Sequence, residues 1–442
     1  MRLKSSPKLP NYHRGRTPED TLAHVTPLID RVGITRLSDI TGLDRLGIPV
    51  WSSVVPKSGD ILSVYNGKGS TSIGSKVGAI MEAFERQASI KGRGPVIRGS
   101  YAELSRKRRV MDPQTMVLPL RDGYSPDKQL AWATGHTLME GEEILVPFDL
   151  AWLVTDSNLR AYTIASSNGL SAGNTYEEAV FQGLCEVVER DAWTIAEVLS
   201  HWLPRARFDA ARARAGLPKV TWTGTDEQPF DDDADRFPEI DPDSFEGELR
   251  RVYELFADAQ LETRVRQVSC DTGIPVMLAS VVEPVGPDLP RSHMGAGCHP
   301  DPTIAALRAL TEAAQSRVVD IQGVREDMSG AGENVPAYMT HTQRVTKINR
   351  RNWLIRPSST RKPLQEVERV RTEDTLDDIR QLVGRLRDLG LEAIEVDVTD
   401  PELGIPVARV IVPGAESWAA DHCRISKRAS RYWSQNAQTR PT

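Results

Sequence analysis

The chain has 442 residues, of which 39% are hydrophobic and 26% charged, as expected for an ordinary soluble globular protein with a sizeable core. Its net charge of -6 and its pI near 5.9 argue against nonspecific binding to nucleic acid. No apolar run is long enough to cross a bilayer and no secretory segment opens the sequence, so we expect a cytoplasmic protein that does not associate with membranes.

The cysteines are scattered and form no C-x-x-C pair: Cys185, Cys270, Cys298 and Cys423. This distribution argues against structural zinc and for a reducing compartment. Cys298 precedes His299 in a glycine-rich stretch, which leaves a catalytic thiol open as an alternative, although we do not expect one.

In chain order, the first strong helical pattern runs from Lys76 to Ile90. Glu82, Glu85 and Arg86 share one stripe of this helix, and apolar residues occupy the opposite face. A glycine-rich stretch, residues 66–70, precedes it.

A strand-like run from Ala161 to Ser166 and a second glycine-rich stretch, residues 167–174, precede a helix from Glu178 to Trp193. Polar residues recur along this helix at spacings of four, four and three residues: Glu178, Gln182, Glu186 and Glu189, followed by Arg190. Thr175-x-x-Glu178 also has the spacing of a capping box, so a helix-start role for Glu178 stays open beside ligand binding.

The segment from Thr223 to Glu248 is rich in Asp, Glu and Pro, and we expect a mobile insert whose acids are solvated. It is followed by an amphipathic helix from Ser244 to Ala259 and a strand from Val276 to Val282.

A third glycine-rich stretch, residues 295–300, leads into a helix from Pro302 to Val318, with Asp301 as the expected N-cap. The polar stripe recurs in this helix at Arg308, Glu312 and Gln315, and Arg317 completes the pattern.

Near the end of the chain we expect a helix from Thr375 to Leu389, a strand from Pro406 to Val412 and a polar, frayed tail after Glu416. The alternation of strands and helices predicts an α+β fold in one continuous domain.

Three helices thus repeat a pair of polar groups three residues apart with an arginine close behind. Taken alone, each helix is better explained as a solvated face than as part of a site. Glycine-rich loops before all three would let backbone N–H groups approach an anion, and four carboxylates brought together would need cations to neutralise them. The sequence therefore predicts a metal–phosphate site. It has no Walker A spelling, and Lys68 is as consistent with a turn lysine as with a phosphate contact.

These motifs, in this order, resemble the YcaO domain family, whose members use ATP to activate peptide backbone amides. The resemblance covers roughly residues 13 to 415 and rests on six stretches: 66–69, 82–86, 167–179, 186–190, 295–302 and 308–317. It implies one α+β domain in which mixed and antiparallel sheets and helices surround a nucleotide site. Residues 1–60 would be its N-terminal segment, 61–416 the ATP-binding catalytic core with the acidic insert 223–248, and 417–442 a polar tail.

The resemblance also implies roles for individual residues, with ATP and Mg²⁺ as cofactors. The Mg²⁺ ligands would be Glu82, Glu85, Glu186 and Glu189. The nucleotide would contact Arg14, Thr21, Asn174, Glu178, Arg190, Arg308, Glu312 and Gln315. The family usually has Ser four residues before the first Glu, where this chain has Gly78, so a hydroxyl contact there is lost or moved. No further catalytic residue is identified.

The C-terminus lacks the Pro-x-Pro-x-Pro ending of many azoline-forming members, and residues 41–51 and 404–414 resemble the branch that acts with TfuA-type partners in backbone thioamidation. That branch implies a ribosomally made precursor peptide or protein substrate, a TfuA-like partner, a sulfur donor and a homodimer. An azoline-forming cyclodehydratase and a noncatalytic nucleotide-binding accessory protein remain alternatives.

Overall fold

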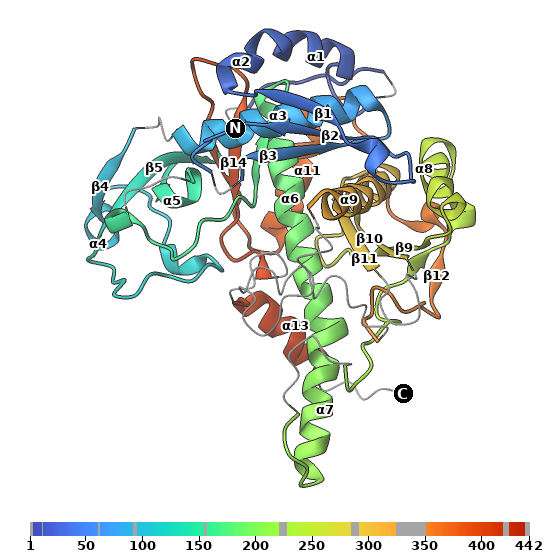
Figure 1. Ribbon diagram of the computed structural model, residues 1–442. Coiled ribbons are helices and arrows are strands. Elements are labelled where there is room, and N and C mark those ends of the chain that lie inside the picture. Colours follow the sequence, from blue (N-terminus) through green and yellow to red (C-terminus); the bar gives the residue numbers. More distant parts are fainter. Residues whose placement is uncertain are drawn as a thin grey trace.

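The computed structural model describes residues 3–10, 12–60, 62–91, 95–153, 157–220, 228–283, 291–323, 351–418 and 424–437. The strands within these ranges form three sheets, and one long helix, α6, runs through the middle of the molecule (Figure 1). The α+β fold predicted from the sequence is confirmed.

The N-terminal part forms a three-stranded antiparallel sheet in the order β1-β2-β3. Its strands and helices are α1 (Pro18–Val25), α2 (Ile29–Val32), β1 (Arg36–Asp39), β2 (Val50–Val54), β3 (Val64–Lys68) and α3 (Ser72–Lys91). The α3 helix packs on β2 and β3 and buries Ile80 and Phe84 against Tyr65. Burying such side chains is the main favourable term in folding, and it leaves the opposite, acidic stripe of α3 facing the centre of the molecule.

The second sheet is antiparallel, with the order β4-β5-β13-β14-β7 and with β6 paired to β5. It comprises β4 (Ile97–Ser100), β5 (Gln129–Thr137), β6 (Glu143–Pro147), β7 (Leu170–Ala172), β13 (Ile394–Asp397) and β14 (Val407–Ile411). Two short helices, α4 (Tyr101–Leu104) and α5 (Phe148–Ala151), pack on its β4–β6 end. The fully buried Trp132 lies in its core.

The third sheet has the order β11-β10-β9-β8-β12, and its β12–β8 pair is parallel while the other pairs are antiparallel. Its elements are β8 (Glu239–Ile240), β9 (Glu262–Gln267), β10 (Val276–Glu283), β11 (Arg291–Cys298) and β12 (Arg361–Lys362), with α8 (Gly247–Asp258) and α9 (Pro302–Gly323) packed on it.

The α6 helix (Tyr176–Glu197) joins the second and third sheets, because it contacts β7 and β14 of the second and β10 and β11 of the third. It continues through a π-helical turn, η5 (Val198–Trp202), into α7 (Leu203–Arg214), which projects from the body (Figure 1). The helices α11 (Thr375–Asp388) and α13 (Lys427–Ala437) also pack against α6. No helix in the described ranges is long and apolar enough to cross a bilayer.

The predicted helices and the strands β10 and β14 lie where their periodicity placed them. The strand predicted at Ala161–Ser166 is wrong. Tyr162 makes only an isolated antiparallel bridge with Leu120, and the backbone N–H groups of Ala161 and Tyr162 donate instead to the Asp149 carboxylate, at 3.0 and 2.9 Å. The nearest strand is β7, which begins at Leu170.

The prediction that residues 223–248 form a solvated insert is wrong for 228–248, the part of this segment that the structure describes. Asp232 is 4% exposed, and the carboxylate of Glu239 pairs with Arg266 at 3.0 Å in the interior. The segment also contains β8 and the start of α8. Asp232 and Glu239 thus have partners in the interior, which composition alone does not reveal. Residues 223–227 lie outside the described ranges.

The frayed tail predicted for residues 417–442 is also wrong where the structure describes it. Arg428 of α13 forms an ion pair with Asp191 of α6 at 3.1 Å. The buried Glu416 accepts hydrogen bonds from the backbone N–H groups of Ser426 and Ala429. Residues 419–423 and 438–442 lie outside the described ranges.

Candidate functional site

The three glycine-rich stretches lead into the three helices mainly as strands rather than as loops. They supply residues of β3, β7 and β11, which precede α3, α6 and α9. A Cβ atom at Gly67 would collide with the Ser75 carbonyl oxygen, and one at Gly297 would collide with the Ala305 carbonyl oxygen. Glycine is therefore needed for strand and helix to approach each other, and the predicted loop conformation is wrong for these residues.

Five carboxylates from the three helices face one another. They are Glu82 and Glu85 of α3, Glu186 and Glu189 of α6, and Glu312 of α9. Burial raises the pKa of Glu82 and that of Glu189 to about 7. Burial, with the charges of Glu82 and Glu186, raises the pKa of Glu85 well above its usual value. Without a cation, several of these acids therefore favour the protonated form.

Some of the clustered carboxylates remain reachable from solvent. Glu189 is 4% exposed, whereas Glu82, Glu85, Glu186 and Glu312 are partly exposed. The acids are thus set deep enough to lose much of their hydration but are not sealed off, which is the situation of groups that receive a ligand.

Basic side chains surround the acids. Lys68 of β3 forms an ion pair with Glu312. Burial raises the pKa of Glu312, but the charges of Lys68 and Arg190 together have the larger effect and lower it. Arg190, Arg409 and Arg308 oppose the rise that burial imposes on the pKa of Glu186. The site therefore mixes both signs of charge, as a site for metal-bound phosphate requires.

Arg308 has one group left without a partner. Its guanidinium donates to the Gln182 side chain at 2.9 Å, but its buried Nε makes no hydrogen bond in the described structure. A buried guanidinium N–H without an acceptor is costly, so an anionic oxygen would be a favourable partner there.

The arginines of the repeated pattern do not act alike. Arg86 turns to Asp60, at 2.8 Å, and Arg317 turns to Asp44, at 2.7 Å. Arg190 instead stays beside the acids and lies over the Trp193 ring. Of these three arginines, only Arg190 on α6 therefore stays beside the clustered carboxylates.

Four predicted nucleotide residues form one hydrogen-bonded network at the start of α6. The buried Glu178 accepts from Gly15 N at 2.8 Å and from the Asn174 side chain at 3.1 Å, and Arg14 lies 3.4 Å away. The Thr21 hydroxyl lies 2.9 Å from Asn174 Oδ1. Thr175 caps the helix by accepting from Glu178 N, whereas the Glu178 carboxylate binds the N-terminal segment.

The remaining predicted residues lie where α9 meets β3. Gln315 donates to the Asn66 carbonyl oxygen at 2.8 Å, and Asn66 N donates to Glu82 at 3.2 Å. Gly78 packs against Gly67, since a Cβ there would lie 3.3 Å from Gly67 Cα. The exchange of Ser for Gly at this position therefore accompanies close packing of α3 on β3.

The sequence did not decide whether Lys68 is a turn residue or a site residue, and it did not identify Asn66 or Arg409 as site residues. The alternation of β3 could have indicated that residues 66 and 68 share a face. Arg409 is buried in β14 and donates to the Ser166 carbonyl oxygen at 2.6 Å, and no local pattern distinguishes it from a structural arginine.

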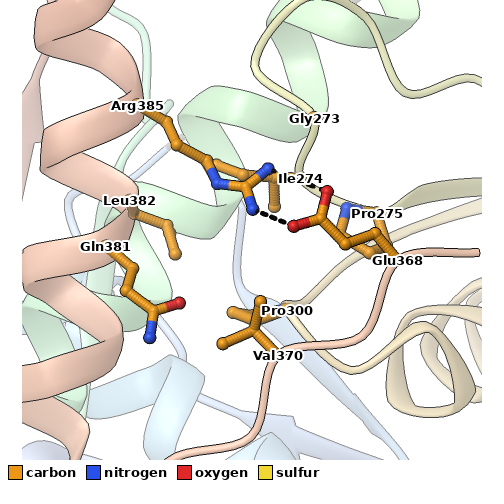
Figure 2. Close-up of a pocket in the computed structure, with 9 residues that line it drawn as sticks. All are labelled: Gly273, Ile274, Pro275, Pro300, Glu368, Val370, Gln381, Leu382 and Arg385. Carbon is orange, nitrogen blue, oxygen red and sulfur yellow. Dashed lines mark hydrogen bonds and ion pairs between the residues drawn. The ribbon is translucent and has the colours of Figure 1, made fainter.

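A separate, small pocket lies between α11 and the turn that joins β9 to β10 (Figure 2). Arg385 and Glu368 pair across it, and Figure 2 shows mainly apolar residues around this pair. None of the clustered carboxylates lines it. We therefore locate the candidate site at the acid cluster.

The donor set suits Mg²⁺ that is bound partly by phosphate. Among the described residues, no three His, Cys, Asp or Glu side chains are placed to hold a metal ion by themselves. Mg²⁺ typically takes one or two carboxylates and completes its octahedron with water and phosphate oxygens, so a protein cage is not required. The five carboxylates and the unpaired Arg308 Nε fit Mg²⁺ with a nucleotide.

Comparison with known proteins places this arrangement in a family. The model of the YcaO cyclodehydratase family, described as ATP- and Mg²⁺-binding, matches residues 66–416. A protein of Methanothermobacter thermautotrophicus is 33% identical over 93% of this chain and 97% of its own length. A Rhizobium leguminosarum bv. trifolii protein, described as encoded in the tfuA 3′ region, is 31% identical over 93% of this chain and 91% of its own. The chain belongs to the YcaO family.

Solved structures agree with this assignment. YcaO from Methanopyrus kandleri, bound with AMPPCP and Mg²⁺, superposes with a TM-score of 0.64 at 25% identity, covering 94% of this chain and 95% of that one. A heterocyclase in complex with substrate and cofactor superposes with a TM-score of 0.73 at 24% identity, over 94% of this chain. This chain spans 54%, about half, of that heterocyclase, so the likeness shows the fold.

Proposed function

We propose that this chain is an ATP- and Mg²⁺-dependent enzyme that phosphorylates the oxygen of a peptide backbone amide so that sulfide can replace it, giving a thioamide. The observation that carries the proposal is the convergence of five carboxylates, Lys68, Arg190 and Arg308 on one partly exposed site. The Methanopyrus kandleri structure with AMPPCP and Mg²⁺ supports this choice of cofactors.

Within this proposal, the residues divide into two groups along α6. The Mg²⁺ ligands are Glu82, Glu85, Glu186 and Glu189. The nucleotide is held by Arg14, Thr21, Asn174, Glu178, Arg190, Arg308, Glu312 and Gln315. The first four of these lie at the start of α6 and would hold one end of the nucleotide, while Arg308 and the acids would hold its phosphates with Mg²⁺.

The chain's own groups position charge rather than form covalent bonds. Bound ATP with Mg²⁺ supplies the phosphoryl group that converts an amide oxygen into a leaving group. Arg308 and Arg190 hold negative charge on the phosphates, and Lys68, bound to Glu312, keeps that carboxylate ionised. Displacement by sulfide then forms the C=S bond and releases phosphate.

The choice of thioamidation over azoline formation rests on two observations. One relative is described as lying in the tfuA 3′ region, and residues 41–51 and 404–414 resemble the branch that acts with TfuA-type partners. We propose a TfuA-like partner, a sulfur donor, a precursor peptide or protein and a homodimer. Residues 61–416 would form the catalytic core and residues 1–60 would close one end of the nucleotide site.

The test combines the purified chain, a TfuA-like protein, a candidate peptide, Mg-ATP and sulfide. ATP-dependent replacement of oxygen by sulfur raises the peptide mass by about 16 Da, whereas azoline formation lowers it by about 18 Da and needs no sulfide. Loss of water without sulfide would favour the cyclodehydratase. ATP binding without any modification, by a chain whose partner and peptide are shown to bind, would favour an accessory protein.

A further inference from the structure

Another small pocket lies at the start of β7, next to the acid cluster. Its volume is about 20 Å³, which is room for a single molecule the size of water or a little larger. Val187 of α6 lines the pocket, and the residue before it, Glu186, belongs to the acid cluster. The facing wall comes from β14 and the segment after it, and includes Arg409 and Ser417. The pocket therefore adjoins the clustered carboxylates.

The segment before β7 is held against β14 as one wall of this pocket. The Ser166 carbonyl oxygen accepts from the Arg409 guanidinium at 2.6 Å, and the Ser166 hydroxyl accepts from Asn168 N at 3.2 Å. Gly169 has a φ of +83°, and a Cβ atom there would collide with the Val410 carbonyl oxygen. Only glycine allows this approach, and it keeps Asn168 at the pocket wall.

The pocket combines a buried cation with an acceptor that lacks a donor. Arg409 is 3% exposed. Asn168 Oδ1 is buried and makes no hydrogen bond in the described structure. Much of the remaining lining is apolar, including Met116, Leu118 and Leu150. A buried charge and a buried oxygen without a donor are both costly, and a ligand of the right chemistry would lower that cost.

Arg409 also connects the pocket electrostatically with the acid cluster. Burial raises the pKa of Glu186, and Arg409 is one of the cations that oppose this rise. Its positive charge therefore acts on the carboxylate and on the pocket. An anion in the pocket would be attracted by Arg409, which offsets the repulsion from the nearby carboxylates.

The hydrosulfide ion has the complementary chemistry. It carries one negative charge, which pairs with a guanidinium, and one S–H, a weak donor that can bond to an amide oxygen. Sulfur is also polarisable and packs well against apolar side chains. Chloride has the charge but no hydrogen, and water has hydrogens but no charge, so each matches only part of the lining.

We propose that this pocket binds the hydrosulfide ion that attacks the phosphorylated amide, with Arg409 pairing with its charge and Asn168 accepting from its S–H. The assignment rests on the proposed function, because that function makes sulfide the nucleophile. In the reaction, an electron pair of sulfur forms a bond to the amide carbon. The bond from that carbon to the phosphorylated oxygen breaks, and its electron pair leaves with the phosphate. The S–H proton passes to the phosphate, which leaves the C=S bond.

Bromide, a heavier anion of the same charge, tests the pocket without any reaction. Crystals of the full-length protein soaked in sodium bromide should show anomalous scattering in the pocket, within contact distance of the Arg409 guanidinium. Arg409→Met should lose this signal, and if that variant does not fold, the wild-type signal decides. A wild-type pocket that holds only water at high bromide concentration would overturn the assignment.

Kinetics test the identity of the nucleophile. With the TfuA-like protein and saturating Mg-ATP and peptide, the rate of thioamide formation is measured against sulfide concentration. Asn168→Leu should raise the KM for sulfide by about ten-fold and leave the KM values for ATP and peptide unchanged. Asn436→Leu, on α13 and outside the pocket, is the matched control. Should Asn168→Leu fail to fold, Ser417→Val replaces it with the same expected result.

The outcomes separate the pocket from the proposed function. A bromide signal together with an unchanged KM for sulfide in the folded pocket variant would mean an adventitious anion only, and the hydrosulfide site would be wrong. A wild-type chain that binds peptide and Mg-ATP but forms no thioamide at any sulfide concentration would instead contradict the proposed function itself.

Discussion

Ionising the buried carboxylates of the acid cluster costs free energy, and a bound cation would remove that cost. Burial raises the pKa of Glu82 to about 7, and Glu186 and Glu82 add to the rise at Glu85. Buried like charges are tolerated only with compensation, and the nearby cations do not abolish these shifts. Buried acids whose pKa values are raised in this way are the ones expected to bind a ligand.

Replacing one acid of each pair should separate binding from folding. Glu82→Gln and Glu186→Gln should each weaken Mg-AMPPCP binding by at least about ten-fold, since even outer-shell partners of a metal cost that much. The melting temperature without ligand should not fall, because each change removes a buried like charge. Calorimetry and thermal scans measure both, with Glu254→Gln as control. Unchanged affinity in both variants would remove these acids from the site.

The acid pairs could be predicted because side chains three residues apart share one side of a helix, whatever surrounds it. The partners toward which the arginines turn could not be predicted. Arg86 and Arg317 turn to Asp60 and Asp44, which are distant in sequence, and only the tertiary structure brings those partners into reach. Lys68 was undecided for the same reason, since its partner Glu312 lies on another sheet's helix.

Whole elements were predicted well where periodicity was strong and poorly where composition was the guide. The helices α3, α6, α9 and α11 have one apolar face and were located within a few residues. The segment 228–248 was taken for a solvated loop because its composition is acidic. Two of its acids are instead bound in the interior, Glu239 by Arg266 and Asp232 by His201 and the backbone of Trp353, and a composition count cannot detect such partners.

The interior position of this segment predicts a cost for Asp232→Ala. The change leaves Gln228, His201 and Trp353 N without their acceptor in the interior, so we expect a loss of about 2 kcal/mol or more. Asp231→Ala, at a neighbouring exposed carboxylate, should stay within about 0.5 kcal/mol. Denaturant unfolding compares the two. Equal stability of both variants would show that the segment is not part of the core.

Arg428 ties the helix α13 to α6 by an ion pair. Arg428 binds Asp191 and Asp271, so Arg428→Met should release α13 and increase hydrogen exchange at residues 427–437. Arg431→Met, at an exposed position of the same helix, is the control. Protection that survives in Arg428→Met would show that the apolar contacts of Tyr432 and Trp433 suffice.

The same contact predicts a pH dependence of α13 docking. Burial raises the pKa of Asp271, but Arg428 has the larger effect and lowers this pKa below its usual value of 3.8. The unfolded form therefore binds more protons at low pH, so the stabilisation is present above about pH 4 and is lost as the pH falls further. Asp271→Asn should remove this dependence. The Asp191 carboxyl has the opposite effect on how stability changes with pH, because burial raises its pKa. A loss of docking that persists in Asp271→Asn would assign the effect to other groups.

Across the whole molecule, the site joins parts that lie far apart in sequence. Residues 14–21, α3, α6 and α9 each supply groups, and these elements pack on different sheets. The repeated pattern allowed the sequence to predict that the three helices contribute to one site. It could not predict which strand packs on which helix, because that depends on glycine contacts such as Gly67 with Ser75.

Because all of these elements supply groups to the site, nucleotide binding should stabilise them together. At a hundred-fold excess of Mg-AMPPCP over its Kd, linkage adds about 2.7 kcal/mol to the stability of the binding-competent form. Hydrogen exchange should then slow in α3, α6 and α9 alike, with a higher melting temperature. In Glu186→Gln the same ligand concentration should protect all three helices less. Protection confined to α6 would mean that the ligand does not bridge the three helices, and the shared site would have to be abandoned.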